Sequence, residues 1–306
     1  MPHKTVARTR LAYLVMLVAP LFFASNMVFG RSVVNDVSPF TLALLRWLIV
    51  ATVLLPVMYG QRHALQRLVK TRWRLLLLIA FLGMWFCGGG VYLGLRWTTA
   101  TNGTLIYTTS PVIILLMEAA FKGRRIGLRE GLGALLAFLG VCVIVMRGDL
   151  AALTSLQFNI GDLMFVGAAI AWAAYSILYR SPALEGLSNA AMLGLMALAG
   201  ALLLLPAAGL ESAAGAVLPT TTQAWMGIAG IVIFPSLLAF STFQFGIREL
   251  GAPVASMFMY LMPPYGVLLA MVFLGEELAL FHLVGIALVM GGVVLATFPS
   301  RKRAAS

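Results

Sequence analysis

The chain has 306 residues, of which 61% are hydrophobic and 10% are charged, and its mean hydropathy is +0.99. Soluble domains carry about 25% charged residues, so a chain this long with so few charges cannot cover a surface in water, and lipid must surround most of it. The formal charge of +11 does not indicate nucleic-acid binding. The basic residues stand at the ends of apolar runs, and none is part of a basic patch interleaved with aromatic residues.

A bilayer core requires about 20 apolar helical residues, and ten runs of this kind follow one another along the chain. The first run is long for the apolar region of a signal peptide, and we expect it to remain as a span. The segments between the runs are short, which leaves no room for a separate soluble domain. The runs cover residues 11–31, 40–59, 75–95, 100–121, 128–146, 162–179, 188–210, 223–246, 252–274 and 279–298.

The lysines and arginines predict the orientation. If the N-terminus is cytoplasmic, seventeen of them lie on the cytoplasmic side and three, Arg31, Arg96 and Arg147, lie outside. Because cytoplasmic loops carry an excess of basic residues, we expect a multi-pass protein of the inner (plasma) membrane with both termini in the cytoplasm. Arg46 is the one basic residue inside a span. We interpret it as an architectural anchor that pairs with Asp36 or with helix C-terminal carbonyls.

The two halves of the chain resemble each other. Ser25–Ser32 aligns with Ala174–Ser181 at an offset of 149, and a series of matches follows at an offset of 152. An odd number of spans, five, separates the copies, so the second copy enters the membrane from the opposite side. We therefore expect two inverted five-helix repeats, residues 1–150 and 151–306, and such repeats build alternating-access transporters. The matches at 152 are Gly94/Gly246, Arg96/Arg248, Pro111/Pro263, Phe121/Phe273, Gly123/Gly275, Gly133/Gly285 and Gly140/Gly292.

Two stretches and the ten-span layout resemble a known group of transporters. "LLRWLIVATVLL" (residues 44–55) is similar to the Arg-aromatic-Leu-Leu pattern of the drug/metabolite transporter superfamily, EamA type, and residues 260–295 are similar to its closing Pro…Gly-Glu…Gly…Gly element. Within the superfamily the chain resembles the YddG-like amino-acid and metabolite exporters. The resemblance implies an all-α membrane protein of ten helices around a central cavity. It also implies a small-molecule substrate that crosses the inner membrane, usually outward.

Polar and aromatic side chains within spans are the candidates for the substrate path, because polar groups that face lipid are costly. The repeat pairs Asn26 with Tyr175, Tyr92 with Gln244, and Thr108 with Tyr260. Aromatic rings suit an apolar part of a ligand or its ammonium group, and hydroxyls suit a polar end, so an amino acid or a similar amphipathic metabolite fits. The predicted substrate-binding residues are Asn26, Trp85, Tyr92, Thr104, Tyr107, Thr108, Trp172, Tyr175, Gln244 and Tyr260. For each one, helix packing or an interhelical hydrogen bond is the competing interpretation.

Glycine and proline mark the candidate hinges. Gly88, Gly89 and Gly90 permit close helix approach or a flexible segment. Pro111, Pro263 and Pro264 remove backbone donors in spans four and nine, which produces either a hinge or a static kink.

Glu118 is the one carboxylate within a span. It is either a proton-coupling site or, as its spacing of four residues from Lys122 favours, half of a helical ion pair. With no carboxylate at mid-span, transport down a gradient is favoured over proton coupling.

The sequence favours no enzymatic function. Two cysteines and three histidines, scattered along the chain, provide no metal site and no nucleophile with a base. The lack of a GxxxxGK[ST] loop disfavours an ATP-driven pump. We therefore expect no catalytic residue, no metal and no cofactor, and a monomer that binds no nucleic acid. The alternatives to an ATP-independent amino-acid exporter are a proton-coupled drug or metabolite exporter and a non-gated, channel-like pore.

Overall fold

The computed structural model of the chain describes residues 6–31, 33, 36–98, 100–149, 159–274 and 277–297. Within these residues every regular element is a helix, and ten spans are long and apolar enough to cross a membrane. The prediction of an all-α protein with ten membrane spans is therefore confirmed. Residue 150, where the two predicted repeats meet, and Gly275 lie outside the described residues, so the division of the chain into repeats stays a prediction at that boundary.

Several spans consist of more than one helical element. The elements are α1 (Val6–Arg31), α2 (Pro39–Gly60), α3 (Arg62–Ala80), the π-helix η1 (Phe81–Gly90), α4 (Val91–Gly94), α5 (Ala100–Tyr107), α6 (Ser110–Lys122), α7 (Leu128–Val145), α8 (Ile160–Tyr179), the 3₁₀-helix η3 (Pro182–Leu184), α9 (Asn189–Ala213), α10 (Thr222–Ile231), the π-helix η4 (Val232–Leu238), α11 (Ala239–Leu250), α12 (Ala252–Met257), the 3₁₀-helix η5 (Phe258–Leu261), α13 (Met262–Leu274) and α14 (Leu280–Thr297).

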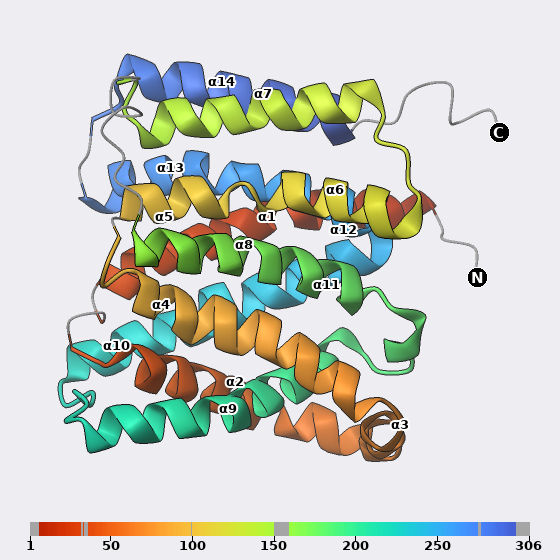
Figure 1. Ribbon diagram of the computed structural model, residues 1–306, viewed down its shortest axis with the longest axis vertical. Coiled ribbons are helices and arrows are strands. Elements are labelled where there is room, and N and C mark those ends of the chain that lie inside the picture. The colour runs from red at the N-terminus through yellow and green to blue at the C-terminus, as the bar shows by residue number, and fades with distance from the viewer. Residues whose placement is uncertain are drawn as a thin grey trace.

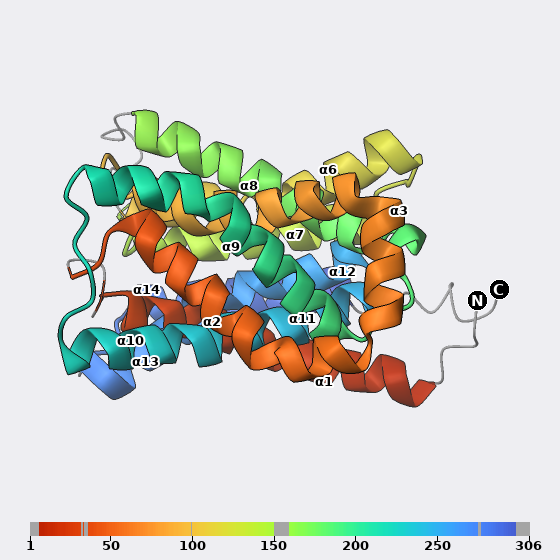
Figure 2. The same ribbon diagram turned by 90° about the horizontal axis from the view of Figure 1, so that it is seen from below.

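The spans run side by side, and the start of α1 and the end of α14 lie at the same end of the bundle (Figure 1). One difference from the sequence prediction is the basic segment after the second span, which is helical rather than a loop. There α3 starts across the end of the bundle and kinks at Arg72, whose φ of −132° and ψ of 21° are not helical (Figure 2). Its buried Leu68 faces the protein while Arg67 and Lys70 are exposed. An apolar stripe beside a charged face stabilises such a helix at an interface.

The third and eighth spans each contain a π-helix, η1 and η4, at positions related by the repeat. The offset of 152 places Gly83 of η1 on Pro235 of η4. Pro235 lacks an N–H and cannot continue the α-helical bonding, and the hydroxyl of Ser236 donates to Ile231 O instead, at 2.6 Å. π-helical turns are rare and often occur at functional sites.

The fourth and ninth spans are interrupted at corresponding positions. The fourth span breaks after Tyr107, at Thr108 and Thr109, and the ninth narrows into η5, whose last residues, Tyr260 and Leu261, align with these threonines. Pro111 and Pro263 each lie in the first turn of the helix that follows the break. The N–H that a proline lacks is not needed there, because an N–H group in the first turn of a helix has no intrahelical acceptor.

The spans α7 and α14 form an antiparallel pair at one edge of the bundle and meet backbone to backbone (Figure 1). A Cβ added to Gly133 would lie 2.6 Å from the backbone oxygen of Gly292, and one added to Gly140 would lie 2.7 Å from that of Gly285. The predicted repeat aligns Gly133 with Gly285 and Gly140 with Gly292. The contact between Gly133 and Gly292 is therefore equivalent, under the repeat, to the contact between Gly285 and Gly140. Glycine is therefore the residue that this close approach requires.

The spans α2 and α9 also pair antiparallel, and each caps the other. Glu211 of α9 accepts hydrogen bonds from the backbone N–H groups of Phe40 (3.0 Å) and Thr41 (2.8 Å) in the first turn of α2. At the other end Gln61, next to α2, accepts from the N–H of Ser188 (2.9 Å), the residue that caps α9. Gln61 and Glu211 are 150 positions apart, so this contact also occurs once in each half.

We predict that Gly133→Ala or Gly292→Ala lowers the apparent melting temperature in detergent. The added methyl would overlap backbone atoms of the facing helix, and overpacking of this kind costs about 1–3 kcal/mol. Gly131→Ala is the matched control on α7, because its Cβ would find only Ile126, 3.9 Å away. Equal melting temperatures for all three variants would contradict the backbone contact.

Candidate functional site

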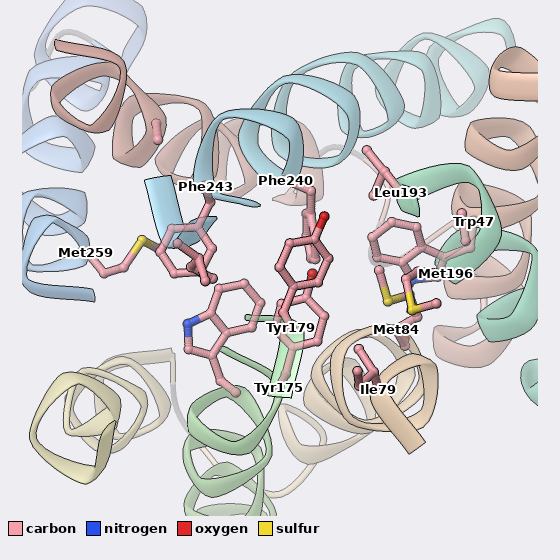
Figure 3. Packing of buried hydrophobic residues seen from close by; sticks show 14 of the residues in the cluster. Trp47, Ile79, Met84, Tyr175, Tyr179, Leu193, Met196, Phe240, Phe243 and Met259 are labelled. Carbon is pink, nitrogen blue, oxygen red and sulfur yellow. Dashed lines mark hydrogen bonds between the residues drawn. The ribbon is translucent and has the colours of Figure 1, made fainter. Parts of the chain in front are cut away.

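The centre of the bundle holds an aromatic cluster of Phe23, Tyr107, Trp172, Tyr175, Phe240 and Phe243. The Trp172 ring stacks on Tyr175 and Phe243, at centroid distances of 5.3 and 5.1 Å, and meets Phe23 and Phe240 edge-on at 5.8 and 5.7 Å. Figure 3 shows Tyr175 and Tyr179 of α8 pointing toward Phe240 of α11. Offset and edge-on contacts such as these add to the stabilisation from burial.

Two polar pairs lie beside this cluster, one in each half of the chain. Gln244 Nε2 donates to Tyr175 Oη at 2.8 Å, and Tyr92 Oη donates to Asn26 Oδ1 at 3.4 Å. The repeat aligns Asn26 with Tyr175 and Tyr92 with Gln244, so the two hydrogen bonds correspond to each other. Tyr179 Oη also donates to Gln244 Oε1, at 3.0 Å. Buried side-chain amides and hydroxyls must find partners within the protein, and here they find each other.

Arg46 and Trp47, neighbours on α2, hold the two π-helices. Arg46 Nη2 donates to Pro235 O in η4 at 3.0 Å, and Trp47 Nε1 donates to Met84 O in η1 at 3.2 Å. Arg46 Nε also donates to Ser236 Oγ, at 2.6 Å. We predicted either Asp36 or a backbone carbonyl as the partner of Arg46, and the structure shows a backbone carbonyl. Asp36 is not a partner, and the carbonyl belongs to an irregular turn within a span rather than to a helix C-terminus.

The broken spans carry four of the predicted substrate-binding residues. The Tyr107 ring lies 6.3 Å from that of Trp172, and Thr104 is partly buried. Thr108 donates to Leu105 O within its own turn, at 2.8 Å. Tyr260 is fully buried, and its hydroxyl has no hydrogen-bond partner among the described residues. A buried hydroxyl without a partner is costly, which makes Tyr260 Oη a candidate donor to a ligand.

The structure brings most of the predicted residues together. Trp172, Tyr175 and Gln244, each at most 3% exposed, are packed in this conformation, while Asn26 and Tyr107 are partly buried. Trp85 lies in another set of rings, stacked on Phe81 at 5.1 Å and tilted against Phe40. The assignment of these side chains to substrate stays a prediction.

Several residues of the site are absent from the sequence prediction. Phe23, Phe240 and Phe243 were not distinguished from other apolar residues, since a phenylalanine within a span is ordinary. Ser236 was overlooked too. Its signal was Pro235 inside the eighth span, since a proline there leaves a carbonyl that a nearby hydroxyl can bind.

Two of the three candidate hinge glycines, Gly88 and Gly89, are closely packed against α2. A Cβ on Gly88 would lie 3.2 Å from Trp47 Nε1, and one on Gly89 would lie 2.5 Å from the Phe40 ring. All three hinge glycines, Gly88 to Gly90, end the π-helix η1. Of the two roles predicted for these glycines, the structure therefore shows the close approach of neighbouring helices.

Glu118 forms the predicted ion pair. Its Oε1 lies 2.9 Å from Lys122 Nζ, with the carboxylate buried and the lysine largely exposed. The acid thus has a fixed partner at the end of α6.

An apolar cleft of about 350 Å³ lies between α6 and α7, away from the aromatic cluster. A single hydroxyl, that of Thr109, is the one hydrogen-bonding side chain in its lining, so it does not suit a polar metabolite. Its lining is Thr109, Val112, Leu115, Leu116, Ile126, Gly131, Ala134, Leu135 and Phe138.

Comparisons with known proteins agree with this architecture. Two segments of the chain, residues 10–146 and 159–298, match the EamA-like transporter family. One solved crystal structure superposes with a TM-score of 0.76 over 96% of this chain and 99% of the other, at 21% identity. At that identity the likeness shows the fold alone.

Similar sequences carry transporter names. The uncharacterized transporter YetK of Bacillus subtilis is 26% identical over 95% of this chain and 88% of its own length. The uncharacterized transporter YyaM of the same organism is 23% identical over 93% of each chain. A probable terminal-alkyne amino-acid exporter of Streptantibioticus cattleyicolor is 29% identical over 64% of this chain and 63% of its own.

We predict that Gln244→Leu destabilises the protein by about 1–2 kcal/mol, because it leaves the hydroxyls of Tyr175 and Tyr179 without their buried partner. Thermal unfolding in detergent measures this. The triple variant with Tyr175→Phe and Tyr179→Phe added should recover part of the loss, since no polar group is then stranded. Tyr59→Phe, at a 69% exposed tyrosine, is the control. A Gln244→Leu variant as stable as this control would show that the bonds contribute nothing.

Proposed function

The chain belongs to the EamA-like transporter family and is a multi-pass membrane transporter, and we propose that it exports small amphipathic metabolites. Amino acids with aromatic or neutral side chains are the substrates that we propose, moved by alternating access without ATP. We further propose that it works as a monomer in the inner membrane with both termini in the cytoplasm.

The observation that carries this proposal is that four spans depart from the regular α-helix, and that they do so in two pairs related by the repeat. The π-helices η1 and η4 and the breaks at Thr108 and at η5 fall at equivalent positions of the two halves. In transporters built from inverted repeats, discontinuous helices surround the substrate at the repeat interface. One polar pair is linked to η4, since Arg46 donates to both Tyr92 Oη and Pro235 O, and Tyr175 of the other pair packs against Gly83 of η1. These contacts support a path beside the π-helices.

The chemistry of the cluster supports an amphipathic substrate. The partly buried ring of Tyr107 offers a face for an apolar group or an ammonium, and Asn26, Tyr92 and Tyr260 offer hydrogen bonds. One relative is named as an amino-acid exporter, which favours amino acids over other amphipathic metabolites.

We propose that the irregular segments are also the moving parts. The turns that follow Tyr107 and Met257 interrupt the helical bonding, and Pro111, Pro263 and Pro264 keep those interruptions in place. Gly88, Gly89 and Gly90 would let η1 change its contacts with α2. Since Glu118 is already paired with Lys122, it is a poor candidate for a proton carrier.

We expect liposomes that contain only this protein to exchange labelled L-phenylalanine or L-leucine with saturable kinetics and with counterflow, in the absence of ATP. Asn26→Leu should lower the flux about tenfold, because it removes an accepting oxygen from the path. Pro111→Ala and Pro263→Ala should slow exchange if the breaks move. Gly209→Ala is the control, because nothing lies within 4 Å of its added Cβ.

Three outcomes would contradict parts of this proposal. Flux that rises linearly with concentration would favour the channel-like pore. Flux that stops without a pH gradient would favour the proton-coupled exporter. Exchange of none of the amino acids would exclude them as substrates.

A further inference from the structure

Arg46 is a charged side chain in the interior of a membrane span, and it is 6% exposed. Among the described residues no carboxylate lies within ion-pair distance of it, and all its hydrogen-bond partners are neutral: Ser236 Oγ, Pro235 O and Tyr92 Oη. The face of the Trp47 ring, with its centroid 4.7 Å from Cζ, completes the surroundings. A charge within a bilayer is costly, and those that persist commonly face a partner charge or a transport path.

The guanidinium also has spare hydrogen-bonding capacity. It carries five N–H groups, and the described residues accept three of them, the one to Tyr92 Oη at a long 3.4 Å. One N–H on each terminal nitrogen is left without an acceptor among these residues. Two parallel N–H groups of a guanidinium suit the two oxygens of a carboxylate.

The equivalent position in the second half of the chain carries no charge. At the offset of 150 that relates α2 to α9, the equivalent of Arg46 is Met196, which is fully buried. At the offset of 152 the equivalent of Ser236 is Met84, which packs on α9 against Gly200, one turn after Met196; Figure 3 labels both methionines. Two methionines thus occupy in one half the place that Arg46 and Ser236 occupy in the other. The positive charge is therefore present in one half of the chain and has no counterpart in the other.

Arg46 is connected to the proposed path through hydrogen bonds. Tyr92 Oη accepts from Arg46 Nη1 and donates to Asn26 Oδ1, and Asn26 is partly exposed. A substrate whose polar end is held by Asn26 and Tyr92 would therefore have that end next to the guanidinium of Arg46.

We propose that Arg46 binds a carboxylate of the substrate, so that the transported metabolites are carboxylic acids, amino acids among them. This inference rests on the proposed transport function. It also predicts selectivity: amines and amides of the same size and apolarity are poor substrates. In the proposed orientation the charge lies in the outer half of the path, and the two methionines lie in the inner half.

The test compares L-phenylalanine, L-leucine and L-alanine with their amides in liposomes that contain the full chain. We expect the ratio of maximal flux to half-saturation concentration to be at least about tenfold higher for each acid than for its amide. Arg46→Gln should remove this preference, since its amide can still donate to Ser236 Oγ or Pro235 O but carries no charge. Arg46→Lys should keep part of it. Arg67→Gln, at an exposed arginine of α3, is the control.

A binding measurement without transport separates this inference from the proposed function. In detergent, 3-phenylpropionate should raise the melting temperature of the wild-type protein, 2-phenylethylamine should not, and Arg46→Gln should abolish the difference. Equal shifts with the acid and the amine, or an unchanged acid preference in Arg46→Gln, would overturn the carboxylate site. A carboxylate-specific shift without any amino-acid flux would support the site and contradict the export of amino acids. The wild-type comparison stands even where Arg46→Gln does not fold.

Discussion

The architecture depends on one constraint: lipid offers no hydrogen-bond partner to the N–H and C=O groups of the backbone. With no water in the hydrocarbon core, every N–H and C=O must be satisfied inside the protein, yet four spans leave the α-helical pattern. Arg46 and Trp47 of α2 resolve this for the π-helices by donating to Pro235 O and Met84 O, and Ser236 does so for Ile231 O. Irregular backbone is therefore held in place by side chains of another span, and α2 connects the two halves of the transporter at its centre.

The sequence predicts most of this architecture, and the limits of the prediction have physical causes. Ten spans follow from hydropathy, because lipid exposure makes apolar runs unavoidable. Four glycines that match at the offset of 152 meet in the structure, Gly133 with Gly292 and Gly140 with Gly285; the matches alone did not predict these contacts. The π-helices were not predictable from hydropathy, which does not respond to how a helix bonds. The partners of Arg46 were not predictable, because Ser236 is 190 positions away in the sequence and hydropathy does not show which spans face each other.

The candidate site was predicted less completely than the fold. Polar residues within spans are recognisable because their burial in lipid is costly. The hydrogen bonds Tyr92–Asn26 and Gln244–Tyr175 correspond to each other under the predicted repeat, although the sequence did not predict them. Aromatic residues give no such signal, because a phenylalanine is as favourable against lipid as in a cluster. Trp85 illustrates this, since its neighbours are Phe81 and Phe40 rather than the cluster around Trp172.

The glycine contacts between α7 and α14 have a mechanical consequence. Side chains between helices act as adjustable packing that can change rotamer as helices slide, but backbone atoms in direct contact cannot. A pair joined at Gly133, Gly140, Gly285 and Gly292 has no such compliance, so α7 and α14 translate and rotate as a single rod. Because this rod contains one helix from each half, it would provide a fixed frame for the movement that we propose for the irregular spans.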